Sequence, residues 1–374
     1  APAITLRGVH FSRERLLNEI ADNGALTFAI AFWTRELDYA AFYKTLPEEE
    51  AYQRVHRMLS EPDTEFVGDV YTTRRRVLGD TNRPRLNIVT ILEESFGSEF
   101  WGSLGRKGPT LTPEMDRLAA EEGLLFSNIY ASGNRTVRGL EGVLSSFPPL
   151  PGDSIVRRTL SANVESIARI LKRDGYHTVF LYGGRGIFDG MRTFAVNNGY
   201  DRFIEQKHFE DPIFKTIWGV CDEDPFNRGI EECRALAQAG EPFLATLLTV
   251  SNHKPYTYPK DRIAENPDER KREHAVKYTD YALGEFFRRA KKEPFWTNTL
   301  FVVVADHGAR VFGSQSIPIY SYEIPLLIAG PAVVKGPARV PHLGCSMDVA
   351  PTILGMIGRP YETLFFGRDL LKSP

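Results

Sequence analysis

The sequence lacks the features that mark several classes of protein. It has only three cysteines, Cys221, Cys233 and Cys345, and their spacing contains no CxxC pair, which argues against a zinc ribbon or a redox pair. The formal net charge is −2 and no long run of lysine and arginine occurs, so the electrostatic footprint of a nucleic-acid binder is missing. We expect no nucleic-acid partner, and any recognition of an anion must be local.

Long apolar runs are also missing. The stretches "ALTFAIAFW" at 25–33 and "TLFVVVA" at 299–305 are much shorter than the roughly 20 residues that a bilayer-spanning helix needs. No segment of the chain is therefore expected to cross a membrane. The chain starts with "APAITLRGVHF", which contains neither an initiator methionine nor a secretory signal, so we expect it to be a piece of a longer protein.

The sequence does have enough apolar material for a full core. Hydrophobic residues make up 42% of its 374 residues and charged residues 25%, which excludes disorder. Residues 1–80 are rich in helix formers and aromatic side chains, and the polar, proline-marked segment "GDTNRPRLN" at 79–87 follows them. We therefore divide the chain into a helical lead-in at 1–80 and a larger domain at 81–374.

Within the larger domain, short apolar runs alternate with helical patterns. Runs typical of buried strands are "NIVTILE" at 87–93, "HTVFLY" at 177–182, "PFLATLLTVS" at 242–251 and "TLFVVVA" at 299–305. The segment "TPEMDRLAAEEG" at 112–123 has proline near its start and glycine at its end, as helices do. Continuous apolar strands separated by helices predict an α/β fold with a mostly parallel central sheet and helices on both faces.

Acidic and imidazole side chains follow two of these strands. The segment "TILEES" ends the first strand at Glu93 and Glu94, and "FVVVADHG" delivers Asp306 and His307. Chemistry in such sheets gathers at the carboxyl ends of strands, where carboxylates and an imidazole can reach one cation. Taken singly, each pair could instead cap a helix or lie in a solvated turn. Taken together, they predict a divalent metal site. Glu93 is expected on the opposite face of the strand end, and it could still be an outer neighbour of that site.

A threonine stands at the front of a helical pattern in "YASGNRTVRGL" at 130–140. Thr136 lies between Arg135 and Arg138, and one interpretation is a helix N-cap. The other interpretation is a nucleophile, since a divalent cation lowers the pKa of a hydroxyl bound to it and a helix N-terminus favours an anion. One of the two arginines could then face a phosphate and the other the surface.

Six motifs in order carry a resemblance to a known family. They are "NIVTILEESF", "LTPEMDRLAAEEGLLFSNIYASGNRT", "WGVCDED", "VSNHKPY", "VVVADHG" and "MDVAPTILGMIG". Over roughly residues 85–360, this order resembles the lipoteichoic acid synthase and phosphoglycerol transferase branch of the alkaline phosphatase and sulfatase superfamily. The resemblance implies an alkaline phosphatase/sulfatase-like catalytic domain at 81–374.

The same resemblance implies roles for the residues at the strand ends. In the family, the residue matching Thr136 is the nucleophile, and those matching Glu94, Asp306 and His307 hold one divalent metal ion together with it. Manganese is the expected metal, with magnesium and zinc as alternatives. His253 in "SNHKPY" matches a histidine near the substrate phosphate, where it would manage protons; the alternative is a solvated loop histidine.

Other positions are assigned from the resemblance or left without chemistry. The loop "YGGRGIFDGMRTF" at 182–194 is expected to bind the phosphoglycerol headgroup through Phe188 and Arg192, with Arg135 beside the nucleophile. Solvated side chains are the alternative there. The segment "WGVCDED" at 218–224 is assigned no chemistry, and "MDVAPTILGMIG" has the helical spacing of a core segment.

The implied activity is the covalent transfer of glycerol phosphate. Thr136 would attack a phosphatidylglycerol-type donor, and an acceptor on a glycan, a glycerol-phosphate polymer or water would then take the group. The alternatives are a phosphoethanolamine transferase or phosphodiesterase of the same superfamily and a non-catalytic domain that senses lipid headgroups. The segment at 23–46 resembles a juxtamembrane segment, so we expect an anchor upstream of Ala1 in a bacterial cytoplasmic membrane and this domain outside the cytoplasm, in the periplasm or at the cell surface.

Overall fold

The computed structural model describes residues 11–21, 24–33, 39, 43–158, 161–309 and 317–372. Its centre is a nine-stranded sheet with the order β10-β4-β9-β8-β3-β7-β5-β6, in which β11 also pairs with β4. The strands are β3 (Asn87–Glu93), β4 (Leu124–Tyr130), β5 (His177–Tyr182), β6 (Arg202–Ile204), β7 (Phe243–Leu248), β8 (Thr299–Ala305), β9 (Glu323–Ala329), β10 (Ala338–Val340) and β11 (Gly344–Cys345).

The sheet is mostly parallel, as the sequence predicts. Only β9 runs against its neighbours, pairing antiparallel with both β4 and β8. The four strands β8, β3, β7 and β5 lie side by side and are all parallel. Their carboxyl ends therefore meet along one edge of the sheet, and the candidate active site forms there.

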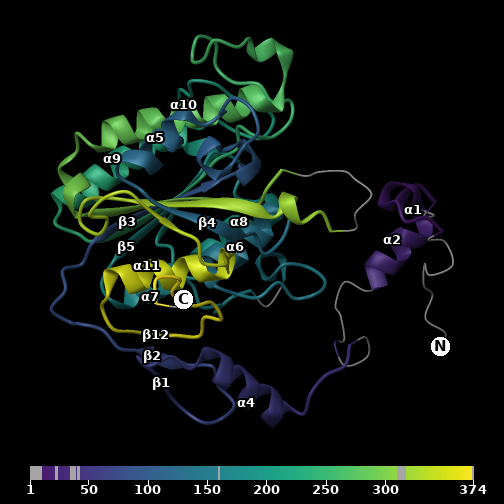
Figure 1. Ribbon diagram of the computed structural model, residues 1–374, viewed down its shortest axis with the longest axis vertical. Helices are drawn as coiled ribbons and strands as arrows, with labels where there is room; N and C mark the ends of the chain where they lie inside the picture. The colour runs from purple at the N-terminus through teal and green to yellow at the C-terminus, as the bar shows by residue number, and fades with distance from the viewer. Residues whose placement is uncertain are drawn as a thin grey trace.

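Helices cover both faces of the sheet. Figure 1 shows α5, α9 and α10 on one side and α6, α7 and α11 on the other. The helices of this domain are α5 (Pro113–Glu121), α6 (Thr136–Ser145), α7 (Ile167–Arg173), α8 (Met191–Asn197), α9 (Glu223–Gln238), α10 (Arg272–Ala290) and α11 (Val349–Ile357). The expected α/β fold with helices on both faces is thus confirmed.

The central strands are buried from end to end because neither face of the sheet is exposed to solvent. Every residue of β3, β7 and β8 is buried, which accounts for their unbroken apolar runs. Local signals set the helix starts: Pro113 occupies the first turn of α5, and the Ser166 hydroxyl accepts from the N–H of Arg169 at the start of α7. Helix α11, from the segment "MDVAPTILGMIG", packs in the core.

The first 80 residues contain strands as well as helices. Helices α1 (Arg15–Ala21), α2 (Gly24–Trp33) and α4 (Glu48–Leu59) are present, but β1 (Thr64–Phe66) and β2 (Arg75–Val77) follow them. These strands form a small antiparallel sheet with β12 (Tyr361–Thr363), which comes from the other end of the chain. The expectation of a helical lead-in is wrong for β1 and β2, because a distant strand completes the small sheet that they form. The boundary at residue 80 stays a prediction.

Parts of the lead-in, including residues 1–10 and 34–38, lie outside the described residues. Within the described part of the chain, no helix has the length and apolar character needed to cross a bilayer.

Candidate active site

The candidate site lies at the carboxyl ends of adjacent parallel strands. Glu94 follows β3, Asp306 and His307 follow β8, and the turn after β7 carries His253. Thr136 opens helix α6, which follows β4. The structure therefore brings together five residues that are up to 213 positions apart in the chain.

Glu94, Asp306 and His307 form a buried cluster that could hold a metal ion. One ligand atom of each lies within 4.8 Å of those of the other two. His307 Nε2 is 3.6 Å from Glu94 Oε1 and 3.6 Å from Asp306 Oδ2. Asp306 Oδ2 is buried and has no hydrogen-bond partner within the described part of the chain. Two carboxylates and one imidazole form a ligand set that suits a divalent cation, and the unpaired Asp306 Oδ2 is a buried oxygen that such a cation would satisfy.

The second nitrogen of His307 supports this assignment. His307 Nδ1 lies 2.8 Å from the carbonyl oxygen of Gly308. A carbonyl can only accept, so Nδ1 carries a proton, and Nε2 is the nitrogen that faces the carboxylates. Metal-binding histidines are commonly oriented by a bond of this kind.

Burial and charge drive the two carboxyl groups in opposite directions. Burial alone would raise the pKa of Glu94, but His253 and then His307 outweigh burial and hold that pKa below its usual range. Burial, and then the neighbouring Glu94 carboxylate, raise the pKa of Asp306 to about 7. Asp306 is thus hard to ionise while Glu94 beside it ionises easily. This contrast indicates that the cluster has too little positive charge for both carboxylates.

Thr136 contacts this cluster through its hydroxyl. Its Oγ1 donates to Glu94 Oε2 at 3.0 Å. Arg135, with an extended backbone, takes the N-cap position of α6, and Thr136 is the first helical residue. The capping interpretation of Thr136 is therefore wrong, since its hydroxyl faces the acidic cluster instead of a backbone N–H of the helix.

Helix α6 is held tightly against the end of β8. A Cβ placed on Gly139 would lie 2.6 Å from both Cβ and the carbonyl oxygen of Asp306. Only glycine permits this approach, which positions Thr136 one turn earlier beside the same strand end. Glu141 and Ser154 fix the far side of the helix through a bond from Ser154 Oγ to Glu141 Oε2 at 2.6 Å.

The two arginines beside Thr136 have different environments. Arg138 is bound to Glu141 Oε1 at 2.6 Å and to the carbonyl oxygen of Leu150 at 2.9 Å, so it is a structural residue. Arg135 is about half exposed and reaches Asp189 Oδ2 at 3.4 Å. Of the two, Arg135 is the one free to turn toward a ligand.

His253 lies within reach of the carboxylate that Thr136 contacts. Its Nε2 is 3.4 Å from Glu94 Oε2, the oxygen that accepts from Thr136. Burial lowers the pKa of His253, but the Glu94 carboxylate outweighs burial and raises it above its usual value. The alternative of a solvated loop histidine does not describe this side chain, which is 27% exposed and paired with the cluster.

Trp218 orients His253, a role that its sequence motif did not reveal. The two rings stack with centroids 4.1 Å apart and an interplanar angle of 14°. Trp218 Nε1 donates to the carbonyl oxygen of Lys254 at 2.6 Å, which fixes the indole against the turn that carries His253. The contact could not be predicted from the motif, because the stack joins two segments that lie 35 residues apart in the sequence.

Asp222, from the same motif, fixes the start of that turn. Its Oδ1 accepts from the backbone N–H groups of Val250 at 3.0 Å and Ser251 at 3.1 Å, and its Oδ2 accepts from the Thr279 hydroxyl. Three donors around one buried carboxylate hold the segment that leads to His253.

Two hydroxyl residues that sequence reasoning did not single out also hold the cluster. Ser95 donates its N–H to Asp306 Oδ1 at 2.9 Å and its hydroxyl to Glu94 Oε1 at 2.6 Å. Thr249 accepts from the N–H of Glu94 and donates to Glu93 Oε2, each at 3.0 Å. Glu93 is thus linked to the cluster through Thr249, and burial raises its pKa well above the usual value.

The two residues expected to bind the headgroup, Phe188 and Arg192 in the loop after β5, have different contacts. Phe188 meets the edge of Trp218, with ring centroids 6.0 Å apart, and so connects to His253. Arg192 is paired with Glu205. Across the described residues, no contact joins Arg192 to the Glu94 cluster.

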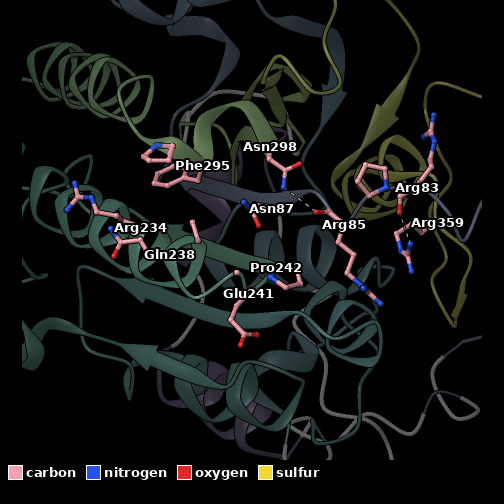
Figure 2. Close-up of a pocket in the computed structure, with 14 residues that line it drawn as sticks. Arg83, Arg85, Asn87, Arg234, Gln238, Glu241, Pro242, Phe295, Asn298 and Arg359 are labelled. Carbon is pink, nitrogen blue, oxygen red and sulfur yellow. Dashed lines mark hydrogen bonds between the residues drawn. The ribbon is translucent and has the colours of Figure 1, made fainter.

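A separate cavity of about 510 Å³ lies at the other end of the strands. Figure 2 shows Asn87, Pro242 and Asn298 there, at the amino ends of β3, β7 and β8, with Arg234 and Arg85 on either side. Arg234 is paired with Glu293 through two bonds, and Arg85 with Asp174. Since this cavity is at the amino ends of the strands, it is not part of the candidate active site.

Several known proteins are similar to this chain. A family model described as Sulfatase matches residues 86–359. A phosphoglycerol transferase I from Xanthomonas campestris pv. campestris (strain B100) is 27% identical over 304 residues, which cover 77% of this chain and 43% of the relative. The chain thus spans less than half the length of that relative.

Solved structures are similar as well. A protein in the alkaline phosphatase superfamily from Vibrio parahaemolyticus is 39% identical, with a TM-score of 0.82 over 89% of this chain and 80% of that chain. The lipoteichoic acid synthase LtaP from Listeria monocytogenes is 22% identical, with a TM-score of 0.69 over 86% of this chain and 82% of that chain, which shows the shared fold.

Proposed function

Because the chain belongs to the Sulfatase family, we propose that it is a metal-dependent phosphoglycerol transferase that works through a covalent intermediate on Thr136. The observation that carries this proposal is the contact of Thr136 Oγ1 with Glu94 at the edge of the buried Glu94, Asp306 and His307 cluster. The relative named phosphoglycerol transferase I supports the choice of transferred group.

The residues that would hold the metal are Glu94, Asp306 and His307, with the hydroxyl of Thr136 as the fourth ligand. Manganese is our choice of metal, with magnesium or zinc as alternatives. When bound, such a cation supplies positive charge that lowers the pKa of the threonine hydroxyl and neutralises charge on the substrate phosphate.

Thr136 performs the first transfer step. Its deprotonated Oγ1 attacks the phosphorus of a phosphatidylglycerol-type donor, the bond to the lipid alcohol breaks, and diacylglycerol leaves with the proton that His253 donates. The glycerol phosphate remains as an ester on Thr136. The N-terminus of α6, which starts at this residue, stabilises the negative oxygens of the group.

His253 manages the protons of the two alcohols. The Glu94 carboxylate favours its protonated form, which suits the donation of a proton to the departing alcohol. The neutral imidazole then accepts the proton of the entering acceptor hydroxyl, which attacks the phosphorus and releases Thr136. Trp218 keeps the ring in place during both steps.

The substrate partners follow from the same chemistry. The donor is a phosphatidylglycerol-type lipid, and the acceptor is a hydroxyl of a glycan or of a glycerol-phosphate chain. Phe188, which lies beside Trp218, is placed to contact the glycerol, and Arg135 and Arg192 are the candidate cations for the phosphate. A lipid donor in a bacterial cytoplasmic membrane agrees with a domain outside the cytoplasm, anchored to that membrane by a segment upstream of Ala1.

Two other activities use the same residues. A phosphoethanolamine transferase or a phosphodiesterase would share the nucleophile and the metal site and differ in the group transferred or in the acceptor. A lipid-headgroup sensor would keep the pocket without turnover. A sulfatase that uses formylglycine is disfavoured, because the proposed nucleophile position holds Thr136 and not the cysteine or serine from which formylglycine is made.

The test is a trapped intermediate. Protein quenched during turnover of a phosphatidylglycerol donor should carry glycerol phosphate on the peptide that contains Thr136, detected by mass spectrometry. Thr136→Ala should abolish both the adduct and turnover, whereas Thr136→Ser keeps a hydroxyl and should retain part of both. Full activity in Thr136→Ala would refute the mechanism, and an ethanolamine phosphate adduct would select the alternative transferase.

A further inference from the structure

Two isoleucines project into solvent beside the candidate active site. The side chain of Ile217 is 80% exposed and that of Ile187 is 76% exposed. Ile187 belongs to the loop after β5, and Ile217 to the turn that precedes α9. Single exposed apolar side chains are ordinary, so their neighbours decide whether these two have a role.

The turn that presents Ile217 is well fixed. Lys215 and Val220 form an antiparallel bridge, and Thr216 N–H donates to the carbonyl oxygen of Gly219 at 2.8 Å. Gly219 has a φ of 155° and packs against the backbone of Gly183, where a Cβ would clash. The exposure of Ile217 is therefore a property of a defined turn.

Exposure alternates along this segment. Ile213, Lys215 and Ile217 are exposed, whereas Phe214 and Trp218 between and after them are partly buried against the domain. The inner side chains anchor the segment, and the outer side chains form a stripe of isoleucine, lysine and isoleucine.

Positive charge surrounds Ile187, and Lys215, one of the cations involved, lies two residues before Ile217. A cavity of about 440 Å³ is lined by Ile187 together with Arg185, Arg192, Glu205, Gln206, Lys207 and Lys215. Its one carboxylate, Glu205, is buried and already bound to the N–H of Gly186 and paired with two of the cations. Glu210 and Asp211 are exposed in the nearby loop but do not line the cavity.

This excess is local, because the whole chain has a formal net charge of −2. Four cationic side chains face one carboxylate here. A surface of this kind attracts an anionic partner, and its isoleucines offer nothing for hydrogen bonding to a sugar.

The same surface is continuous with the catalytic centre. Phe188 follows Ile187, its ring meets Trp218, and Trp218 stacks on His253, which reaches Glu94 at 3.4 Å. A partner on the isoleucines would therefore lie at the mouth of the site.

We propose that Ile187, Ile217, Arg185, Lys207 and Lys215 form a docking surface for an anionic phospholipid bilayer. The proposal rests on the proposed function, since it explains how a site for a lipid-borne donor meets the membrane. The isoleucines enter the boundary between headgroups and acyl chains, and the cations contact the lipid phosphates. The aromatic side chains Phe188 and Trp218 then receive the headgroup next to Thr136.

The test measures binding of the 374-residue chain to vesicles. Phosphatidylcholine vesicles are compared with vesicles that also contain phosphatidylglycerol. One variant combines Ile187→Ser with Ile217→Ser, and a second combines Lys207→Gln with Lys215→Gln. We expect each to weaken binding to the anionic vesicles about tenfold or more, and the wild type to prefer those vesicles.

Matched controls change similar side chains elsewhere. Leu343→Ser with Met58→Ser removes apolar side chains that are 59% and 82% exposed, and Lys292→Gln with Lys335→Gln removes two exposed lysines. Both controls should bind vesicles as the wild type does. Thermal unfolding checks that every variant is folded.

Turnover separates this proposal from the proposed function. A short-chain phosphatidylglycerol that is dispersed as monomers needs no docking, so the two docking variants should turn it over at the wild-type rate and lose turnover only of the vesicle-borne donor.

Equal vesicle binding by the wild type, variants and controls would overturn the docking surface even if turnover is normal. Vesicle binding that follows the expected pattern without turnover of any phosphoglycerol donor would support the docking surface and refute the proposed function. Binding to a soluble polyanion but not to vesicles would overturn the docking surface in favour of an acidic polymer.

Discussion

Gly139 is the position at which a single methyl group tests the architecture of the site. It lies in the first turn of α6, one turn after Thr136. In Gly139→Ala, the new Cβ would be 2.6 Å from Cβ and from the carbonyl oxygen of Asp306, whereas ordinary contacts begin at 3.4 Å. Helix α6 or the end of β8 must therefore move by about 0.8 Å.

The size of the effect follows from two opposing terms. Overpacking a buried contact costs about 1–3 kcal/mol, and replacing glycine by alanine within a helix returns up to about 1 kcal/mol. The fold should survive with a net loss of about 1–2 kcal/mol. Catalysis should suffer more, because a displacement near 1 Å of reacting groups can cost about a hundredfold in rate.

A second glycine of the same helix provides the control. A Cβ on Gly142 would lie 2.6 Å from Cβ of Ser346 and 2.8 Å from the hydroxyl of Ser132, so it is overpacked against side-chain atoms and touches no candidate metal ligand. Urea unfolding, manganese titration and turnover are measured for both variants. We expect both to lose stability, Gly139→Ala at least as much because its Cβ also meets backbone atoms of Asp306, with weaker manganese binding and about a hundredfold slower turnover only in Gly139→Ala. Equal manganese affinity in the two variants would refute the idea that α6 positions Asp306.

Three further predictions follow from the contacts around the site. Trp218→Ala should lower kcat about tenfold because His253 loses its stacking partner, and Trp218→Phe should restore most of the rate; equal losses would contradict the role of the ring. Asp222→Ala leaves two backbone N–H groups without an acceptor and should lower the free energy of unfolding in urea by about 3 kcal/mol; a loss below about 1 kcal/mol would contradict this. Burial and Glu94 raise the pKa of Asp306 to about 7, so below pH 7 a cation must displace the proton of that carboxyl group. Manganese affinity should therefore fall about tenfold for each pH unit below 7 and level off above pH 7. Titrations that give the same manganese affinity below and above pH 7 would refute this.

The parts of the site that sequence could predict are those that one strand end determines. The fully buried strands β3 and β8 are evident from their apolar runs in the sequence. Glu94 directly follows β3 and Asp306 directly follows β8, so both must lie at the carboxyl edge of the sheet. Because neighbouring strands are parallel, these edges coincide, and the cluster follows from local patterns. Thr136 was found in the same way, from its place before an apolar helical pattern.

The parts that sequence could not predict depend on contacts between distant segments. The pairing of β2 with β12 joins residues near 76 and 362, and nothing in either three-residue strand specifies its partner. The stack of Trp218 on His253 depends on how two loops pack. The antiparallel direction of β9 is also invisible, because its apolar run is the same in either direction.

Two buried glutamates, Glu93 and Glu94, lie at the carboxyl end of β3 in different electrostatic environments. Glu93 Oε2 accepts from the hydroxyl of Thr249, its Oε1 is buried without a hydrogen-bond partner in the described chain, and burial and then Asp222 raise its pKa well above the usual value. Glu94 points the other way, where His253 and His307 stabilise its charge. Asp306 completes that second group with a buried oxygen that no hydrogen bond in the described chain satisfies. The metal belongs on the Glu94 face because ligand atoms of two carboxylates and the His307 imidazole lie within 4.8 Å of one another there, a grouping that, among the described residues, does not include Glu93.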